Sequence, residues 1–490
     1  MKELRSYAGE VRRVAGENAP APAHVARARR ERAAPEDAPA VDPASAAQPE
    51  AAHTDRVLAG LRQLDWRAYV EVFRRESLAF KMACIYLLIE YVRPQTIWPM
   101  LDIIPLGITS LAGGVLVVLI SPAERNAKTF GSQMPLLITM LCLIVLSILA
   151  SEYPQFGWNN LSLFINWIMA YYLITKGVNN ERRYMFFYAL FLLFSFKMSQ
   201  HGFKTWASYG FHFNKDGVNG APGWFQNSGE VGIQMCIFLP MLLYFMFAGW
   251  KVWGLWRRLF MLAVTVTAVG TVIGSSSRGA LIGSGVVLLW ILAHSRYKVK
   301  GTIAVACVIT LVALVLPPEF YGRLDSMGDD NSSTTRLEYW AYGWELMKAH
   351  PVLGVGYFNW FPTYAAHLIA IGETRKPEVC HNIFVQAGSE LGFPGVALVL
   401  AIIISIFVLT ARTRKLLAQR PDGEFLANLV RGLDAGMIGY LISAQFVTVL
   451  YYPYLWIELA LVVALHNVAQ RRITAQPGRF GVPSGAPVHA

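Results

Sequence analysis

Charged residues are scarce in this sequence: Asp, Glu, Lys and Arg together make up 15% of its 490 residues. A soluble domain contains roughly 25%, so the deficit argues against a soluble protein. It is concentrated in apolar runs of about 17 to 22 residues, which are long enough to cross a bilayer as helices. The sequence therefore predicts an all-α, polytopic integral membrane protein.

Cysteine is also scarce. Four of the five cysteines lie in apolar runs, where cysteine acts as a small hydrophobic residue, and Cys380 has no expected partner. No Cys-x-x-Cys pair occurs, so neither a disulfide framework nor a zinc site is indicated. His367 and His381 are far apart, and the stretch "DSMGDDNSS" lacks EF-hand spacing. We predict no metal and no cofactor.

The excess of positive charge, +11 overall, lies in alternate connections between the apolar runs, which indicates membrane topology rather than nucleic-acid binding. The positive-inside rule then places both termini in the cytoplasm and two longer loops, 200–228 and 318–393, outside. We expect about twelve spans, with the longest outer loop between the ninth and the tenth. They lie near residues 80–97, 103–120, 134–150, 157–175, 183–199, 229–249, 258–274, 279–294, 301–317, 394–411, 433–450 and 453–469.

The N-terminal region differs in composition from the rest. Residues 1–53 are rich in Ala, Pro, Arg and Glu and lack the apolar core of a signal peptide, which predicts a disordered cytoplasmic tail. Residues 54–77 predict an amphipathic helix on the inner leaflet, with a solvated helix as the alternative. Its apolar positions are Val57, Leu61, Leu64, Ala68 and Val72.

The remaining chain divides into four parts. These are an N-terminal transmembrane region at 78–255, a core at 256–411 that includes the outer loop 318–393, C-terminal transmembrane helices at 412–469 and a polar tail at 470–490.

The second outer loop contains "SSTTRLEYWAYGWELMKAHPVLGVG", which predicts a helix that ends at His350-Pro351. Thr335 and Glu338 have capping-box spacing, so Arg336 would lie in the first turn. A cation is unfavourable there unless an anion binds, because the helix dipole is already positive. Free N–H groups and a guanidinium together would make a phosphate site. The alternative is an exposed arginine with no function.

A second arginine stands at the expected outer end of a span. Arg278, in "GTVIGSSSRGALIG", is flanked by three serines and a glycine. An arginine at a span end often extends to the lipid headgroups, which is the alternative explanation. Because a cation on the outer side runs against the positive-inside trend, we favour a role for Arg278 beside the same outer cavity as Arg336.

The stretch "VCHNIFVQAGSELGFPGVAL" places His381 just before a hydrophobic run. Gly392 suits the end of one helix and Pro394 the first turn of the next, so we expect a short outer helix at 381–391. A histidine there can titrate near neutral pH and accept a proton from a hydroxyl, although a structural histidine is the alternative. Glu390, nine residues on, lies on the opposite helix face and would anchor the helix or pair with another span.

The first outer loop, "HGFKTWASYGFHFNKDGVNGAPGWFQNSGEVGIQM", is rich in Gly, Asn and aromatic residues. Flat aromatic faces stack on sugar rings and amides bond sugar hydroxyls, so this composition suits a glycan. Lys204 and Lys215 add positive charge. Part of the pattern is ordinary helix-start chemistry, because Asn227, Ser228 and Glu230 cap the next span.

Taken together, three stretches resemble the O-antigen ligase and polymerase superfamily. They are "SSSRGAL", "TTRLEYWAYGWELMKAHPVLGVG" and "HNIFVQAGSELGFPG", within about residues 260–405. Upstream, "IEYVRPQTIWPMLDIIPLG" and "WFQNSGEVGIQM" are similar to a branch described as O-glycosylation ligases associated with exosortase systems.

The resemblance implies a multi-pass protein of the bacterial inner membrane that uses an undecaprenyl-pyrophosphate-linked glycan and an extracytoplasmic acceptor. It implies metal-independent, inverting displacement, with Arg278 and Arg336 on the pyrophosphate and His381 deprotonating or positioning the acceptor. Glu152, Lys204, Lys215 and Glu390 are candidate helpers. A polymerase using the same machinery, and a polysaccharide transporter or non-catalytic assembly partner, are the alternatives.

Overall fold

The computed structural model of the chain describes residues 43–212, 217–220, 223–295, 298–315 and 331–474. Its regular structure is helical, and no strand occurs in these residues, which confirms the all-α prediction. Residues 57–490 form one compact unit, and everything below concerns this unit. Of the other unit, residues 1–56, the structure describes only the beginning of α3 (Pro43–Arg62).

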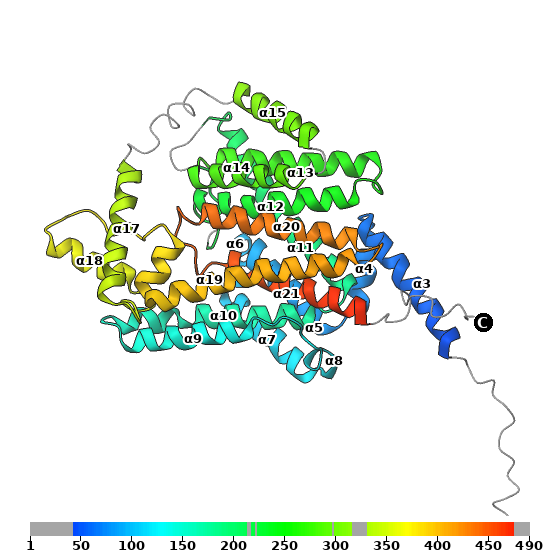
Figure 1. The fold of residues 1–490 in the computed structure, drawn as a ribbon, viewed down its shortest axis with the longest axis horizontal. Coiled ribbons are helices and arrows are strands. Elements are labelled where there is room, and N and C mark those ends of the chain that lie inside the picture. The colour runs from blue at the N-terminus through cyan, green and yellow to red at the C-terminus, as the bar shows by residue number, and fades with distance from the viewer. Residues whose placement is uncertain (1–42, 213–216, 221–222, 296–297, 316–330, 475–490) are drawn as a thin grey trace, which may run out of the picture. The chain divides into compact units, whose positions relative to one another are not determined.

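Figure 1 shows a bundle of long helices, with α17 and α18 beside one end. The helices after α3 are α4 (Trp66–Arg75), α5 (Leu78–Val92), α6 (Pro94–Ile97), η1 (Pro99–Ile103), α7 (Leu106–Ile120), α8 (Pro122–Arg125), α9 (Met134–Leu149), α10 (Pro154–Gly177), α11 (Glu181–Ser208), α12 (Ser228–Gly249), α13 (Leu255–Gly274), α14 (Arg278–Ala293), α15 (Lys298–Val315), α17 (Asn331–Ala349), α18 (Trp360–Ala370), α19 (Ile383–Ala418), α20 (Glu424–Ser443) and α21 (Pro453–Thr474).

Four of the described helices, α12, α13, α19 and α20, are long and apolar enough to cross a membrane. The helices α7, α9 and α14 are apolar but shorter. Each span expected from the sequence overlaps at least one helix, and the first, at 80–97, covers parts of both α5 and α6. The protein is therefore a helical membrane protein, and the twelve-span count and the loop topology stay predictions.

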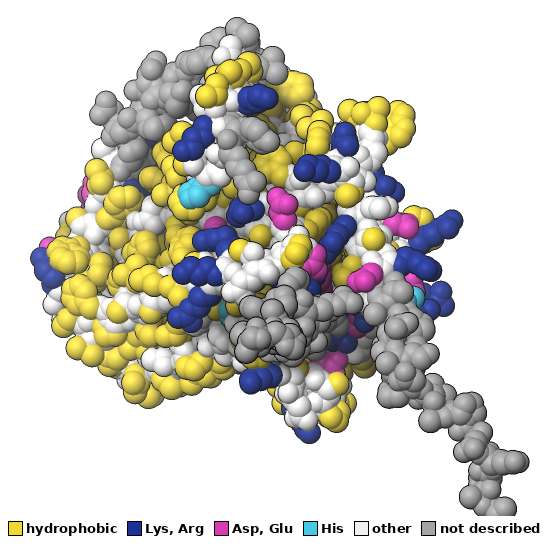
Figure 2. Space-filling view, turned by 45° about the vertical axis from the view of Figure 1, so that its right-hand side comes forward, with side chains coloured by type: hydrophobic (Ala, Val, Ile, Leu, Met, Phe, Trp, Pro, Cys, Tyr) yellow, Lys and Arg dark blue, Asp and Glu magenta, His cyan; other side chains and the backbone are white. Residues whose placement is uncertain are grey.

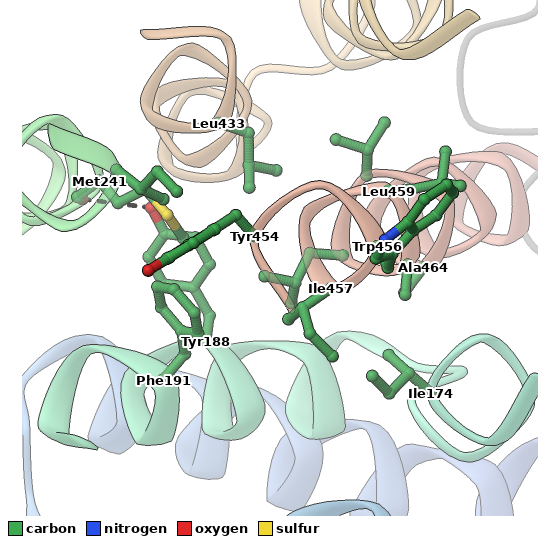
Figure 3. Packing of buried hydrophobic residues seen from close by; sticks show 14 of the residues in the cluster. Ile174, Tyr188, Phe191, Met241, Leu433, Tyr454, Trp456, Ile457, Leu459 and Ala464 are labelled. Carbon is green, nitrogen blue, oxygen red and sulfur yellow. Dashed lines mark hydrogen bonds between the residues drawn. The ribbon is translucent and has the colours of Figure 1, made fainter. Parts of the chain in front are cut away.

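The last helix, α21, lies at the centre of the bundle. Every residue from Pro453 to Ala469 is buried, as expected of a helix that is apolar all round. Figure 3 shows α21 side chains, among them Tyr454, Ile457 and Leu459, surrounded by residues of other helices. These surrounding residues are Ile174 of α10, Tyr188 and Phe191 of α11, Met241 of α12 and Leu433 of α20.

Arg183, at the start of α11, ties several elements together. Its guanidinium lies 2.6 Å from the Glu76 carboxylate and 3.2 Å from that of Glu124, and it donates to the Gly177 carbonyl at 3.0 Å. The three charged side chains are at most 10% exposed, so each charge needs its partner. Charged side chains gather on one face of the molecule, whereas hydrophobic side chains cover much of its flank (Figure 2).

The N-terminal expectations need correction where the structure describes them. Residues 1–42 lie outside the described part, but 43–53 belong to α3 and are not a disordered tail. Two helices, α3 and α4, replace the single helix expected at 54–77, because the chain turns at Leu64 with φ of 58°. The apolar positions Val57, Leu61, Ala68 and Val72 are buried in the protein core rather than free to face lipid.

Two loop boundaries also differ from expectation. The first outer loop starts later than residue 200, because α11 continues to Ser208. Of the polar tail at 470–490, residues up to Thr474 continue α21, and 475–490 lie outside the described residues.

The Arg183 cluster generates a stability prediction. Arg183→Ala leaves the buried Glu124 carboxylate without its cation and Glu76 with Arg182 alone, and is expected to lower the free energy of unfolding by about 3–5 kcal/mol. Arg75→Ala is the control, because Arg75 pairs with Glu71 at an exposed position and should cost at most about 0.5 kcal/mol. Unfolding in detergent measures both, and similar losses for the two variants would contradict the assignment.

Candidate active site

His381 is held by its backbone in an uncommon conformation. It has φ of 53°, in the left-handed region, and its N–H donates to Thr448 Oγ1 at 2.7 Å. The next residue, Asn382, caps α19 by accepting the N–H groups of Phe384 and Val385. The helix therefore begins at Ile383 rather than at 381 as expected, and His381 lies in the turn before it.

The His381 ring has an acidic neighbour that the sequence interpretation missed. Its Nε2 lies 3.6 Å from Glu378 Oε2, and the Tyr339 hydroxyl donates to the same carboxylate oxygen at 3.5 Å. The Tyr339 ring is also near, with its centroid 6.2 Å from that of His381. The spacing of Glu378 and His381 in "EVCH" was the available signal, but outside a helix that spacing alone does not bring two side chains together.

Electrostatics keep the His381 imidazole neutral. Burial lowers the pKa of His381 below its ordinary value, the Arg336 cation lowers it further, and Glu378 raises it in part. A neutral imidazole can accept a proton at pH 7. Because Arg336 is among the groups that lower this pKa, its charge is within electrostatic range of the ring.

Arg336 reaches this position through the packing of α17. Trp340, on α17, donates its indole N–H to the Cys380 carbonyl at 3.1 Å, next to His381. Trp360 donates to the Glu378 carbonyl at 2.9 Å, so the segment 378–381 is held by two tryptophans. The expectation that Arg336 lies in the first turn is wrong, because α17 begins at Asn331 and Thr335 does not cap it.

Arg278 is the first residue of α14. Ser277 caps this helix by accepting the Ala280 N–H at 3.3 Å, and Ser276 turns the chain with φ of 54°. The following Gly279 packs against Phe446, and its carbonyl accepts the Ser443 hydroxyl at 3.1 Å. The three serines before Arg278 therefore build the turn that starts the helix.

Arg278 and His381 are anchored to the same stretch of chain. The connection 444–452 between α20 and α21, together with Ser443 that precedes it, contacts Gly279 through Phe446 and His381 through Thr448. The Ile383 N–H also donates to the Ala444 carbonyl at 3.2 Å. The start of α14, which carries Arg278, and the turn that carries His381 are therefore held by the same short segment.

The His-Pro-x-x-Gly-x-Gly segment braces α19 where that helix kinks. Val355 and Gly356 donate to the carbonyls of Ser389 and Glu390 at 2.8 and 3.1 Å. Gly354 has φ of 63°, and a Cβ there would lie 2.4 Å from the Glu390 carbonyl carbon, so only glycine fits. The kink itself is at Gly392, with φ of 69°, as the sequence predicted.

The candidate helpers are more scattered. Glu390 is buried on α19 beside the Tyr451 hydroxyl, and its role as a helix anchor or as a partner of another span stays a prediction. Glu152 is exposed in the α9–α10 turn, where the neighbouring Tyr153 N–H donates to Asn359 rather than to the His381 region. Lys204 is exposed on α11, and Lys215 lies outside the described residues. Within the described chain, no three His, Cys, Asp or Glu side chains are placed to share a metal ion.

Comparison with known families finds a match to one part of the chain. Residues 263–400 match the sequence model of a family described as O-antigen ligase. The match contains Arg278, Arg336 and His381 and leaves the helices before α13 and after α19 outside. A search among curated proteins finds no match.

The charges around His381 generate a titration prediction. Glu378→Gln removes the influence that raises the pKa of His381, so that pKa should fall further; Arg336→Gln removes one that lowers it, so that pKa should rise. Histidine ring NMR of labelled protein measures both, with the His381→Asn spectrum to assign the signal. If the titration midpoint of His381 were unchanged in both variants, neither Glu378 nor Arg336 would influence its pKa.

Proposed function

Because the chain contains an O-antigen ligase domain, we propose that it is a membrane glycosyltransferase that moves a glycan from undecaprenyl pyrophosphate to an acceptor on the extracytoplasmic face. The observation that carries the proposal is the Arg336 cation beside a neutral, partly exposed imidazole at His381. A cation next to a proton acceptor is what displacement of a diphosphate by a hydroxyl requires. In this proposal the protein lies in the bacterial inner membrane with both termini in the cytoplasm.

The reaction is a single displacement at the anomeric carbon. His381 takes the proton of the acceptor hydroxyl as the new C–O bond forms, and the bond from the anomeric carbon to the pyrophosphate oxygen breaks. The electron pair leaves with undecaprenyl pyrophosphate, whose charge Arg278 and Arg336 neutralise. Attack opposite the leaving group inverts the anomeric configuration. No metal takes part, since two guanidinium groups supply the positive charge.

Glu378 has a supporting part in this proposal. Its carboxylate faces His381 Nε2 at 3.6 Å and also accepts the Tyr339 hydroxyl. It therefore orients the ring and stabilises the imidazolium that forms after proton transfer, as a carboxylate does beside a catalytic histidine. This makes Glu378 a positioning residue rather than the proton acceptor.

The acceptor decides between ligase and polymerase. A ligase transfers to a lipid or protein acceptor, and a polymerase transfers to a second lipid-linked glycan. The exosortase association stays a prediction from the sequence. A transporter or assembly partner would not need a proton acceptor beside the cations, so the arrangement at His381 favours the enzyme.

The first activity test concerns the proton acceptor. His381→Ala is expected to lower transfer in proteoliposomes about 100- to 10,000-fold while binding of the lipid-linked donor survives. His367→Ala is the matched control, because His367 lies on α18 of the same outer loop and stacks on Tyr342. Transfer at the normal rate in His381→Ala would remove the proposed base.

The second activity test concerns the cations and the metal. Arg278→Ala and Arg336→Ala should weaken donor binding as well as transfer, by about 100-fold or more in rate. Arg375→Ala, which breaks the Glu338 pair in the same loop, should retain donor binding. Transfer should also persist in a metal chelator, and its loss there would overturn the metal-independent mechanism.

A further inference from the structure

A polar cavity lies outside the residues that match the ligase family. Its volume is about 260 Å³, and it is lined by the end of α5, the α6–η1 segment, the start of α7, the middle of α10 and Trp224. The surrounding chain is unusual for a membrane protein, because α5 and α7 have only 15 residues each. Irregular backbone between such short helices is tolerated in a membrane where it lines a cavity.

The cavity contains polar atoms that need partners. Glu90 Oε1, Arg93 Nε and Gln95 Oε1 are buried without a hydrogen-bond partner among the described residues. A buried polar atom left unpaired loses its hydration without compensation. Three such atoms on one wall of one cavity indicate that a polar ligand completes the site.

The other lining groups define the chemistry of that ligand. Trp167 and Trp224, with ring centroids 5.8 Å apart, supply flat apolar surfaces, and Asn166 supplies an amide. The lining places two carboxyl groups, those of Glu90 and Asp102, against the single cation of Arg93, so the cavity lacks the excess of positive charge that would favour an anion. We propose that it binds a neutral sugar ring, whose C–H face stacks on indole and whose hydroxyls pair with carboxylates and amides.

The size of the cavity fits one ring. Its volume is below the roughly 300–1,000 Å³ of sites for larger organic ligands. Gly107 lines the cavity, and a Cβ built there meets nothing within 4 Å. A larger side chain at position 107 would therefore fill the space without displacing protein atoms.

The cavity adjoins the connection that supports His381. Trp167 donates its indole N–H to the Tyr451 carbonyl at 2.8 Å, and Trp224 contacts the Tyr452 ring with centroids 4.9 Å apart. Tyr451 is three residues from Thr448, which holds His381, so the two points are at most about 10 Å apart along the chain. If the proposed function holds, the bound sugar belongs to the glycan donor or acceptor.

The rim indicates that this sugar is carried by a lipid. The segment 97–104 exposes large apolar side chains, including Ile103 at 87% exposure. Exposed apolar groups beside a sugar cavity suit the hydrocarbon chain of a glycolipid. A lipid-linked sugar and a free sugar would present the same ring to the cavity. The experiment therefore has to distinguish these two ligands.

Binding of simple glycosides tests the cavity without any assay of transfer. The full-length protein is placed in lipid nanodiscs, which avoids sugar-based detergents, and titrated with methyl and octyl glycosides of glucose, galactose and mannose and with methyl glucuronide. At least one neutral glycoside should bind, more tightly than the glucuronide. Its octyl form should bind more tightly than its methyl form; equal affinity would overturn the lipid-borne assignment.

Two variants and two matched controls locate the binding. Gly107→Leu and Asn166→Ala should weaken it at least about tenfold, which corresponds to roughly 1.4 kcal/mol of binding free energy. Gly285→Leu, at another glycine with open space around its Cβ position, and Asn160→Ala, on the same helix as Asn166 but not lining the cavity, should leave binding unchanged. Gly107→Leu keeps every lining side chain, so its effect does not depend on a lost interaction.

The outcome is independent of the catalytic proposal. His381→Ala should bind the glycoside as the wild type does. Binding that Gly107→Leu abolishes, in a protein with no transfer activity, would support the cavity and count against the enzyme. Absence of binding by every neutral glycoside, equal binding to Gly107→Leu, or preference for the glucuronide would overturn the sugar assignment even if transfer occurs.

Discussion

The connection between α20 and α21 is the support on which both sites depend. Thr448 fixes the backbone of His381, Ser443 and Phe446 hold the start of α14, and Tyr451 and Tyr452 hold the tryptophans of the sugar cavity. The connection is itself fixed from inside the bundle, because Gln386 of α19 accepts the Leu450 N–H at 3.3 Å and Trp456 donates to the Leu450 carbonyl at 3.0 Å. A displacement here would reach every group in the proposed reaction.

The glycines and tryptophans around His381 allow segments without regular secondary structure to pack closely and rigidly. Gly354 and Gly392 allow left-handed turns where two segments meet backbone to backbone, and Trp340 and Trp360 each donate to a carbonyl beside His381. Preorganisation of this kind matters for a proton acceptor, because catalysis depends on holding a ring within a fraction of an ångström of its productive position.

Residues with unusual chemistry for their place could be predicted from the sequence. Arg278 and Arg336, on the expected outer side, run against the positive-inside trend, and His381 precedes a glycine-proline break. Each of these signals was weak alone, and the order and spacing of the three stretches together made them specific. The helical class and the kink at Gly392 followed from composition and spacing. The geometry of the site was harder to predict from the sequence. Thr335 has capping-box spacing, yet it lies inside α17, which already begins at Asn331.

What the sequence could not indicate were contacts between distant segments. Thr448 and Gln445 lie in a short connection without charge, and nothing local suggests that they hold His381 and Asn382, more than 60 residues away. The sequence around Glu378 has no distinctive motif, and the position of Glu378 beside the His381 ring depends on the hydrogen bond that Trp360 donates to its carbonyl. The cavity of Glu90, Gln95 and Asn166 arises only when α5, α6 and α10 meet.

The central position of α21 has a consequence for biogenesis. This helix is synthesised after all the other described helices, yet the residues packed around it belong to segments made earlier. The preceding helices must therefore keep a space for α21 until it is synthesised, or separate again to admit it. Glu458 and Asn467 within α21 would meet hydrocarbon during that interval, so insertion and final assembly have to be coupled in time.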